Sequence, residues 1–155
     1  MHVVLVEPEI PPNTGNVARL CAATGAKLHL IEPLGFRLED KDLKRAGMDY
    51  WKHVDWTKWP DWQTFLEQTH PGSKIWFIES DGPMQYAEVT FGPNDYLVFG
   101  RETAGLPMAL VKEQPDQWLR IPMMNPDARS LNLSNCVAIV LYESLRQTGF
   151  SGEIR

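Results

Sequence analysis

Short runs of continuous apolar residues recur along this chain and constrain its fold more than any other feature of the sequence. Each run is about as long as a β-strand, and its apolar residues do not alternate with polar ones. This pattern is typical of strands that are covered on both faces. The runs lie at residues 3–6, 28–31, 75–78, 96–99 and 118–121.

Helical patterns separate several of these runs. The ranges that we expect to be helical are 14–24, 61–69 and 132–147, each with apolar residues gathered on one face. Gly25 and Gly149 follow the first and the last range, where a helix commonly ends. Strands and helices that alternate in a short chain predict an α/β fold, with a mostly parallel sheet flanked by helices.

The composition predicts one domain over residues 1–155, because 43% of the 155 residues are hydrophobic and no boundary divides the chain. We expect no signal peptide and no membrane span, and therefore a cytoplasmic protein. Cys21 and Cys136 lie in apolar helical patterns, which favours buried, reduced thiols. The four histidines show no paired spacing, so we expect no metal site. We expect segment 34–60 to be irregular, with its aromatic side chains covering the sheet or a partner subunit.

Loops beyond the carboxyl ends of strands are where open parallel sheets bind ligands. Loops 7–16 and 100–107 are both rich in special residues, but each alone is more typical of an ordinary strand-to-helix turn. In the first loop, Asn13 or Thr14 is expected to cap the following helix. The stretch 121–135 ends in more small polar residues than a helix cap needs, which indicates a site for a polar ligand. Glycine fingerprints of dinucleotide and phosphate-binding loops are absent from the sequence.

Taken together, these loops resemble those of the SPOUT methyltransferases, most closely the TrmL family of small tRNA wobble-position 2′-O-methyltransferases. The resemblance runs almost end to end. It is carried by residues 7–16, Arg19, 45–50, 99–107, 121–123, 130–135 and 142–143.

The resemblance implies a SPOUT fold with a C-terminal deep trefoil knot, a homodimer, and S-adenosylmethionine as cofactor. It implies transfer of a methyl group to the ribose 2′-hydroxyl of nucleotide 34, cytidine or a modified uridine, in leucine tRNAs. Methyl transfer from a sulfonium is an in-line displacement, which requires alignment and a poorly hydrated pocket rather than a metal.

The resemblance also assigns site residues. The expected cofactor-binding residues are Ile78, Gly100, Ile121, Met123, Ser130, Leu131 and Asn135. The expected catalytic residues are Arg19, Asn13, Ser130, Asn132 and Tyr142. Arg19 is expected to stabilise the forming alkoxide, because a guanidinium stays protonated and cannot act as a base. Asn13 is expected to orient Arg19. Tyr142 is a possible partner of the 2′-hydroxyl or the cofactor, although a tyrosine in such a position is more often part of a core or an interface.

The expected RNA-binding residues are Arg19, Lys41, Lys44, Arg45 and Arg101. A net charge of −5 argues mildly against a nucleic-acid partner, unless these cations from two subunits form one basic cleft. One loop departs from the family pattern Gly-Pro-Glu-Thr-Arg-Gly, since its arginine stands at position 101 instead of position 104, which is Ala104.

Three other functions remain open at this point. The first is a ribose 2′-O-methyltransferase of the same fold that acts at another tRNA or rRNA position. The second is a non-catalytic RNA-binding module on the same scaffold. The third is a small-molecule enzyme that uses NAD, which the missing glycine fingerprint disfavours.

Overall fold

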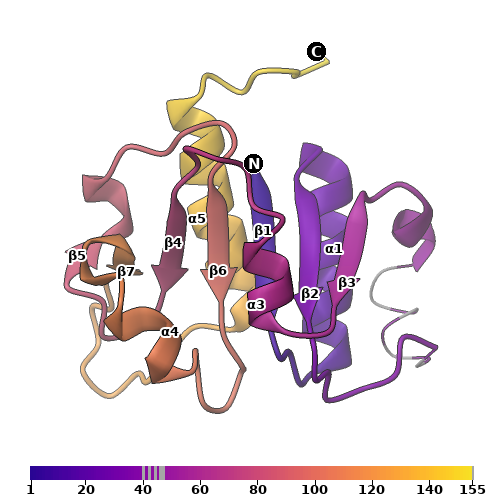
Figure 1. Ribbon diagram of the computed structural model, residues 1–155, viewed down its shortest axis with the longest axis horizontal. Coiled ribbons are helices and arrows are strands. Elements are labelled where there is room, and N and C mark those ends of the chain that lie inside the picture. Colours follow the sequence, from indigo (N-terminus) through magenta and orange to yellow (C-terminus); the bar gives the residue numbers. More distant parts are fainter. Residues whose placement is uncertain (40, 42, 44, 46–47, 155) are drawn as a thin grey trace.

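The strands of the protein form one seven-stranded parallel sheet in the order β3-β2-β1-β6-β4-β7-β5 (Figure 1). The computed structural model describes residues 1–39, 41, 43, 45 and 48–154. The strands are β1 (His2–Val6), β2 (Lys27–Ile31), β3 (Trp56–Trp59), β4 (Ile75–Ile78), β5 (Met84–Gln85), β6 (Tyr96–Phe99) and β7 (Trp118–Arg120). Every apolar run in the sequence is therefore confirmed as a strand to within one residue.

Helices cover both faces of the sheet, which explains why the strands are apolar without interruption. The helices are α1 (Pro11–Thr24), α3 (Trp62–Leu66), α4 (Met108–Lys112) and α5 (Leu133–Gln147), with 3-10 turns η1 (Met48–Lys52), η2 (Tyr86–Glu88) and η3 (Pro115–Gln117). In β1, Val3 and Leu5 pack in one cluster with α1 and α5, whereas Val4 and Val6 pack in the other with α3 and α4. Each buried aliphatic side chain contributes roughly 1.5–3 kcal/mol to folding.

Helix α1 begins earlier than the sequence pattern predicts, and the expected cap is wrong. Its N-cap is Ile10, and Pro11 and Pro12 occupy the first helical positions, where a missing N–H costs nothing. Asn13 and Thr14 therefore lie inside the first turn, and both are buried. The Asn13 side chain is free to make contacts outside its own helix.

The expectation of an irregular segment 34–60 is also wrong in part, because it contains η1 and the edge strand β3. β3 has solvent on one side and only half-buried tryptophans, so it lacks the continuous apolar run of the inner strands. Helix α3 is shorter than the predicted range 61–69. Asp61 caps its start by accepting a 2.7 Å hydrogen bond from the backbone N–H of Thr64.

The connections that follow the adjacent parallel strands β1 and β6 go to opposite faces of the sheet. β1 leads into α1 behind the sheet, whereas β6 leads into α4 in front of it (Figure 1). Loops that diverge in this way leave a crevice at the carboxyl edge of a parallel sheet. The trefoil knot stays a prediction that is consistent with this strand order. None of the described helices has the length and apolar character needed to cross a bilayer.

A chain of hydrogen bonds joins two buried histidines at the opposite, amino edge of the sheet. The indole N–H of Trp59 donates to His29 Nδ1 at 3.0 Å, so His29 must carry its proton on Nε2, which lies 2.9 Å from His2 Nδ1. Burial is the main cause that lowers the pKa of His2 to about 3 and that of His29 to about 4, from an ordinary value of 6.5. Both imidazoles are therefore neutral at physiological pH.

These lowered pKa values predict that acid destabilises the protein well before its carboxylates are protonated. Below about pH 6.5 the unfolded chain takes up protons that the folded chain excludes, so stability is complete above that pH and falls as the pH drops toward 4. We expect a loss on the order of 3 kcal/mol from each histidine by pH 4. Urea unfolding at a series of pH values measures it. The dependence of the unfolding free energy on pH should weaken in His29→Gln and persist in His53→Gln, which changes an exposed histidine. Equal stability of the native chain at pH 7 and pH 4.5 would contradict the prediction.

Candidate functional site

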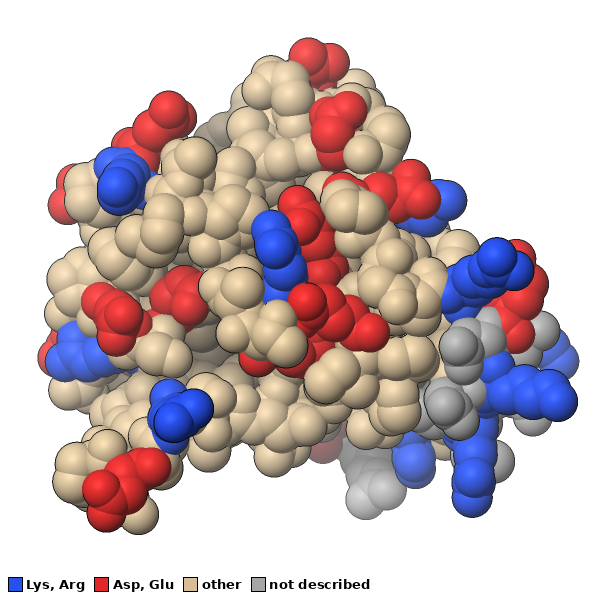
Figure 2. Space-filling model, turned by 90° about the horizontal axis from the view of Figure 1, so that it is seen from below, with Lys and Arg blue, Asp and Glu red and all other residues tan. Residues whose placement is uncertain are grey.

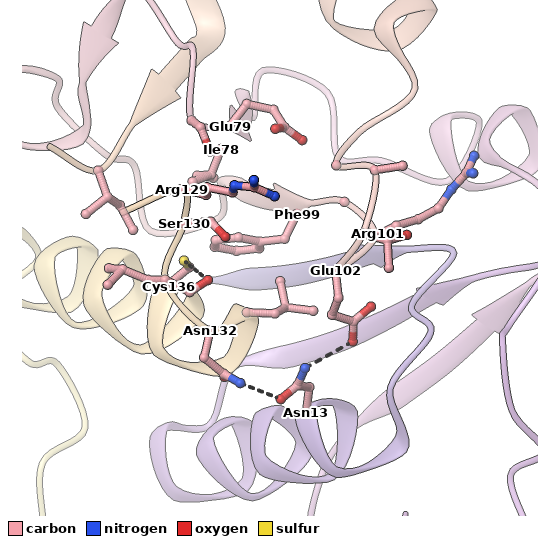
Figure 3. A pocket seen from close by; sticks show the side chains of 18 of the residues that line it. Asn13, Ile78, Glu79, Phe99, Arg101, Glu102, Arg129, Ser130, Asn132 and Cys136 are labelled. Carbon is pink, nitrogen blue, oxygen red and sulfur yellow. Dashed lines mark hydrogen bonds between the residues drawn. The ribbon is translucent and has the colours of Figure 1, made fainter. Parts of the chain in front are cut away.

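A cavity of about 530 Å³ opens at the carboxyl edge of the sheet, beside the switch between β1 and β6 (Figure 3). Four parts of the chain form its walls. They are the start of α1, the end of β4 with the residues after it, the loop after β6, and the segment from the end of β7 into α5. Its lining residues are Ile10, Asn13, 78–81, 99–105, Ile121, Met123, 129–133 and Cys136.

The loop after β1 is fixed by an ion pair to the loop after β6. Glu7 has φ 51°, in the left-handed region that few residues other than glycine adopt. Its backbone N–H donates to the Ile31 carbonyl at 2.9 Å, and its Oε2 lies 2.8 Å from Arg101 Nη2. The arginine that departs from the family pattern is thus held by a carboxylate at the cavity wall.

Two further carboxylates tie the same loops together in a reciprocal way. Glu9, on the first loop, accepts hydrogen bonds from the backbone N–H and the hydroxyl of Thr103 at 2.8–3.0 Å. Glu102, on the second loop, accepts from the backbone N–H groups of Glu9 and Ile10 at 2.8 and 3.1 Å. Each loop therefore supplies an acceptor for the other, and the contacts with Thr103 lower the pKa of Glu9.

Asn13 connects these loops to the start of α5 (Figure 3). Its Nδ2 donates to Glu102 Oε1 at 3.3 Å, and its Oδ1 accepts from Asn132 Nδ2 at 2.9 Å. The other end of the Asn132 amide caps α5, because Oδ1 accepts from the backbone N–H of Ser134 at 2.9 Å. The two asparagines form a polar relay, in which both ends of each amide are occupied.

Glycine at position 100 is required by the close approach of the following turn. A Cβ there would lie 2.1 Å from the carbonyl carbon of Gly105, well inside van der Waals contact. The turn closes through two backbone hydrogen bonds between Arg101 and Gly105, at 3.1 and 3.0 Å. The absence of a side chain at Gly100 therefore lets the loop after β6 fold over itself.

The remaining wall combines apolar side chains with the half-buried acidic group of Glu79. The apolar residues are Ile78, Phe99, Ile121, Met123, Leu131 and Leu133. Glu79 follows Ile78, and its Oε1 accepts a hydrogen bond from the backbone N–H of Leu106. Burial raises the pKa of Glu79 and that of the neighbouring Cys136 thiol, although the Leu106 N–H acts in the opposite direction on Glu79. The Cys136 thiol is therefore a neutral group in this wall.

The structure brings most of the predicted cofactor residues together. Ile78, Gly100, Ile121, Met123, Ser130 and Leu131 all line the cavity. Asn135 is exposed on α5 and does not line the cavity, whereas Leu133 and Cys136 of the same helix do. Among the described residues, no group of three or more potential metal ligands is arranged to hold an ion.

The predicted catalytic residues divide into two sets. Asn13, Ser130 and Asn132 line the cavity, whereas Arg19 and Tyr142 do not. Arg19 is exposed on α1, and its guanidinium carbon lies 5.2 Å from the centre of the Tyr50 ring. The side chain of Asn13 contacts Glu102 and Asn132 rather than Arg19. Within this chain, the guanidinium of Arg19 instead lies over the ring of Tyr50.

Tyr142 lies on the outer side of α5, where it is 49% exposed and its ring centre lies 6.5 Å from that of Phe150. It belongs to a group of large apolar side chains that remain exposed in the single chain, among them Met108, Met124, Phe150 and Ile154. This placement fits a surface residue rather than part of the cavity of the same chain.

The predicted RNA-binding residues lie mostly outside the cavity. Lys41 and Arg45 are exposed, Arg101 lines the cavity, and Lys44 lies outside the described residues. Seen from the carboxyl edge, Lys and Arg side chains gather at the side of the molecule that carries segment 37–45, and acidic side chains lie nearer the centre (Figure 2). The negative net charge is therefore unevenly distributed on this face.

Sequence reasoning did not single out Glu79, Glu102 or Arg129, which all line the cavity. Glu79 carried a usable signal, since it directly follows a predicted strand at the edge where parallel sheets bind ligands. Glu102 lay within a recognised motif, but its contacts are made to backbone groups of another loop. Arg129 stood next to the predicted Ser130 with no distinguishing pattern.

Comparison with known proteins places this geometry among RNA methyltransferases. Residues 1–142 match the model of the SpoU rRNA Methylase family. The chain is 50% identical over 152 residues, 97% of each protein, to a tRNA (cytidine(34)-2′-O)-methyltransferase of Saccharophagus degradans. It superposes with a TM-score of 0.91 and 46% identity, over 96% of this chain and 95% of the other, on a structure that describes 2-OH methylation of C/U34 on tRNA. An AdoMet-bound rRNA methyltransferase of Sinorhizobium meliloti is 26% identical with a TM-score of 0.83, over 94% of this chain and 55% of that one.

The contacts of Glu102 predict that its carboxylate holds the loop after β6 against the loop after β1. In Glu102→Ala, the N–H groups of Glu9 and Ile10 and the amide of Asn13 lose their acceptor, and we expect a loss of about 2 kcal/mol in the free energy of unfolding. Chemical denaturation measures this loss. Glu113→Ala, which removes an exposed carboxylate elsewhere, is the control; an effect of Glu102→Ala no larger than that of the control would show that the loops do not depend on it.

Proposed function

The chain belongs to the SpoU rRNA Methylase family, and we propose that it transfers the methyl group of S-adenosylmethionine to the ribose 2′-hydroxyl of nucleotide 34 in tRNA. The observation that carries this proposal is the cavity at the switch point, which is lined by the residues that the resemblance assigns to the cofactor. The relatives that match almost the whole chain are named for this reaction. We place the whole activity in one domain over residues 1–155.

The cavity suits S-adenosylmethionine in size and chemistry. Its volume lies within the range of small-molecule sites, and its apolar side chains keep water from one wall. Gly100 exposes backbone there because no Cβ fits at that position. We assign Ile78, Gly100, Ile121, Met123, Ser130 and Leu131 to the cofactor and leave out Asn135. When bound, the cofactor supplies a methyl group already activated on a sulfonium.

The residues of this chain then have to position the ribose oxygen and stabilise charge. The relay from Glu102 through Asn13 to Asn132 holds the cavity wall beside Ser130, which keeps the reacting atoms in line. Arg19 donates hydrogen bonds to the forming alkoxide or an adjacent phosphate. Tyr142 contacts the ribose or the cofactor. The hydroxyl proton leaves to solvent, since a guanidinium has no free lone pair to accept it.

Two subunits complete the site in this proposal. Arg19 and Tyr142 lie outside the cavity of their own chain, so a second subunit would have to bring such residues to it. The exposed apolar side chains Tyr142 and Phe150 on and after α5 support a homodimer, because apolar patches on a surface mark interfaces. Arg19, Lys41 and Arg45 from both subunits would provide the basic surface for the anticodon arm, with Lys44 as a further candidate.

The finer parts of the proposal follow the resemblance. We propose leucine tRNAs as the substrates, with cytidine or a modified uridine at position 34, and a cytoplasmic location. Methylation at another tRNA or rRNA position is the second candidate, favoured by the likeness to the AdoMet-bound rRNA enzyme. A cavity with apolar walls and a complete relay disfavours a module that only binds RNA.

Product mapping tests the proposed function directly. Purified protein is incubated with labelled S-adenosylmethionine and total tRNA from a strain that lacks this protein, and the labelled nucleotides are located by sequencing. We expect label on the ribose of nucleotide 34 of leucine tRNAs. Label at another position would favour the second candidate, and tRNA binding without any label would favour the non-catalytic module.

Arg19 provides a second prediction, for which the chain offers a matched control. Arg19→Ala should keep cofactor binding, because Arg19 lies outside the cavity, and lose most methyl transfer. We expect a fall in kcat of about 100-fold, as for loss of a single charge-stabilising donor. In the control Lys74→Ala, the lost cation also lies over an aromatic ring, Trp76, but at the amino edge of the sheet. Calorimetry and a methylation assay measure both properties; unchanged turnover would remove Arg19 from the mechanism.

A further inference from the structure

Glu79 is a cavity residue to which the reaction described above gives no task. Its carboxylate is held against the loop after β6, because Oε1 accepts from the Leu106 N–H and a Cβ on Gly105 would lie 2.6 Å from that oxygen. Its backbone is fixed as well, since the Glu79 N–H donates to the Leu119 carbonyl at 2.9 Å. The side chain therefore occupies a defined place in the wall (Figure 3).

The charges around Glu79 leave its carboxylate without a cationic partner. Among the residues that the structure describes, no Lys or Arg forms an ion pair with it. Arg101 on the facing loop is paired with Glu7, and Glu102 accepts from three donors of the first loop. Asp81 adds a second negative charge on the same segment.

The other titratable neighbours do not supply the missing cation. Cys136 on α5 is a neutral thiol, since burial raises its pKa. Arg129 also lines the cavity, but the ion pairs among the described residues do not include one between Arg129 and Glu79. Burial also raises the pKa of Glu79, which marks a poorly hydrated carboxyl group. A charge in such surroundings acts on a nearby cation more strongly than a charge in water.

We propose that Glu79 makes the cavity bind the positively charged methyl donor in preference to its uncharged product. This inference rests on the proposed function, because it requires S-adenosylmethionine in the cavity. In the transfer, the bond from sulfur to the methyl carbon breaks with its electron pair left on sulfur. A bond from the ribose oxygen to that carbon forms, and the hydroxyl proton goes to solvent. The sulfur loses its positive charge, so the attraction to Glu79 disappears with the reaction.

This preference has a direct consequence for turnover. The donor and S-adenosylhomocysteine share all their other groups, so apolar and backbone contacts bind both about equally. A carboxylate without a cationic partner attracts S-adenosylmethionine more strongly than S-adenosylhomocysteine, because only the donor carries a positive charge on sulfur. The product then leaves more readily than the donor does, and a cell that accumulates S-adenosylhomocysteine inhibits the enzyme less.

The test uses Glu79→Gln, which keeps an oxygen acceptor for the Leu106 N–H and nearly the same volume but removes the charge. Dissociation constants of S-adenosylmethionine and S-adenosylhomocysteine are measured by calorimetry for the native chain and the variant. We expect the constant for the donor to rise about tenfold and that for the product to change less than about twofold. Glu67→Gln, an exposed carboxylate at the end of α3, should change neither constant.

A second variant separates the charge from a structural role. Glu79→Asp keeps the charge but shortens the side chain, so it should retain the preference for the donor even if both ligands bind less tightly. Equal weakening of both ligands in Glu79→Gln would overturn the proposal and show that Glu79 only supports the wall. An unchanged donor constant would overturn it too. If the native chain binds neither ligand, the proposed function itself fails, which is a different result.

Discussion

The reciprocal contact between the loops that follow β1 and β6 is the constraint on which the rest of the site depends. Glu9 accepts from Thr103, and Glu102 accepts from the N–H groups of Glu9 and Ile10. Neither loop has regular structure of its own, so the sheet alone would leave their shapes undetermined. The contact fixes the first wall of the cavity, and Asn13 extends it to Asn132 at the start of α5.

The sequence predicts those features that depend on burial alone. The inner strands are recognisable because both faces are covered, whereas the edge strand β3 lacks that signal. The resemblance places residues such as Ile78 and Gly100 at the cavity correctly. Glu79 follows a predicted strand and could have been found from that position, but the contacts of Glu102 could not, because no sequence pattern reports which backbone N–H groups lie opposite a side chain. The contact of Arg19 with the Tyr50 ring likewise joins two segments that no sequence pattern pairs.

The negative net charge of −5 says little about how the surface meets RNA. Two acidic groups of the loop after β1 are engaged locally: Glu7 with Arg101, and Glu9 with Thr103. Their charges are thereby partly neutralised or stabilised in place, while Lys and Arg side chains gather at one side of the same face. The electrostatic field that an approaching nucleic acid meets depends on where the charged side chains lie on this face rather than on the net charge.

The hydrogen bond between Asn13 and Asn132 joins residues 119 positions apart. Contacts of such long range form late, because most of the intervening chain must first be ordered. During synthesis, the first β-α-β segment can fold while the ribosome is still extending the chain, but its asparagine waits for a partner near the far end. Completion of the cavity wall is thus a late step in the biogenesis of the protein, and a chain that stops before Asn132 lacks the residue that Asn13 contacts.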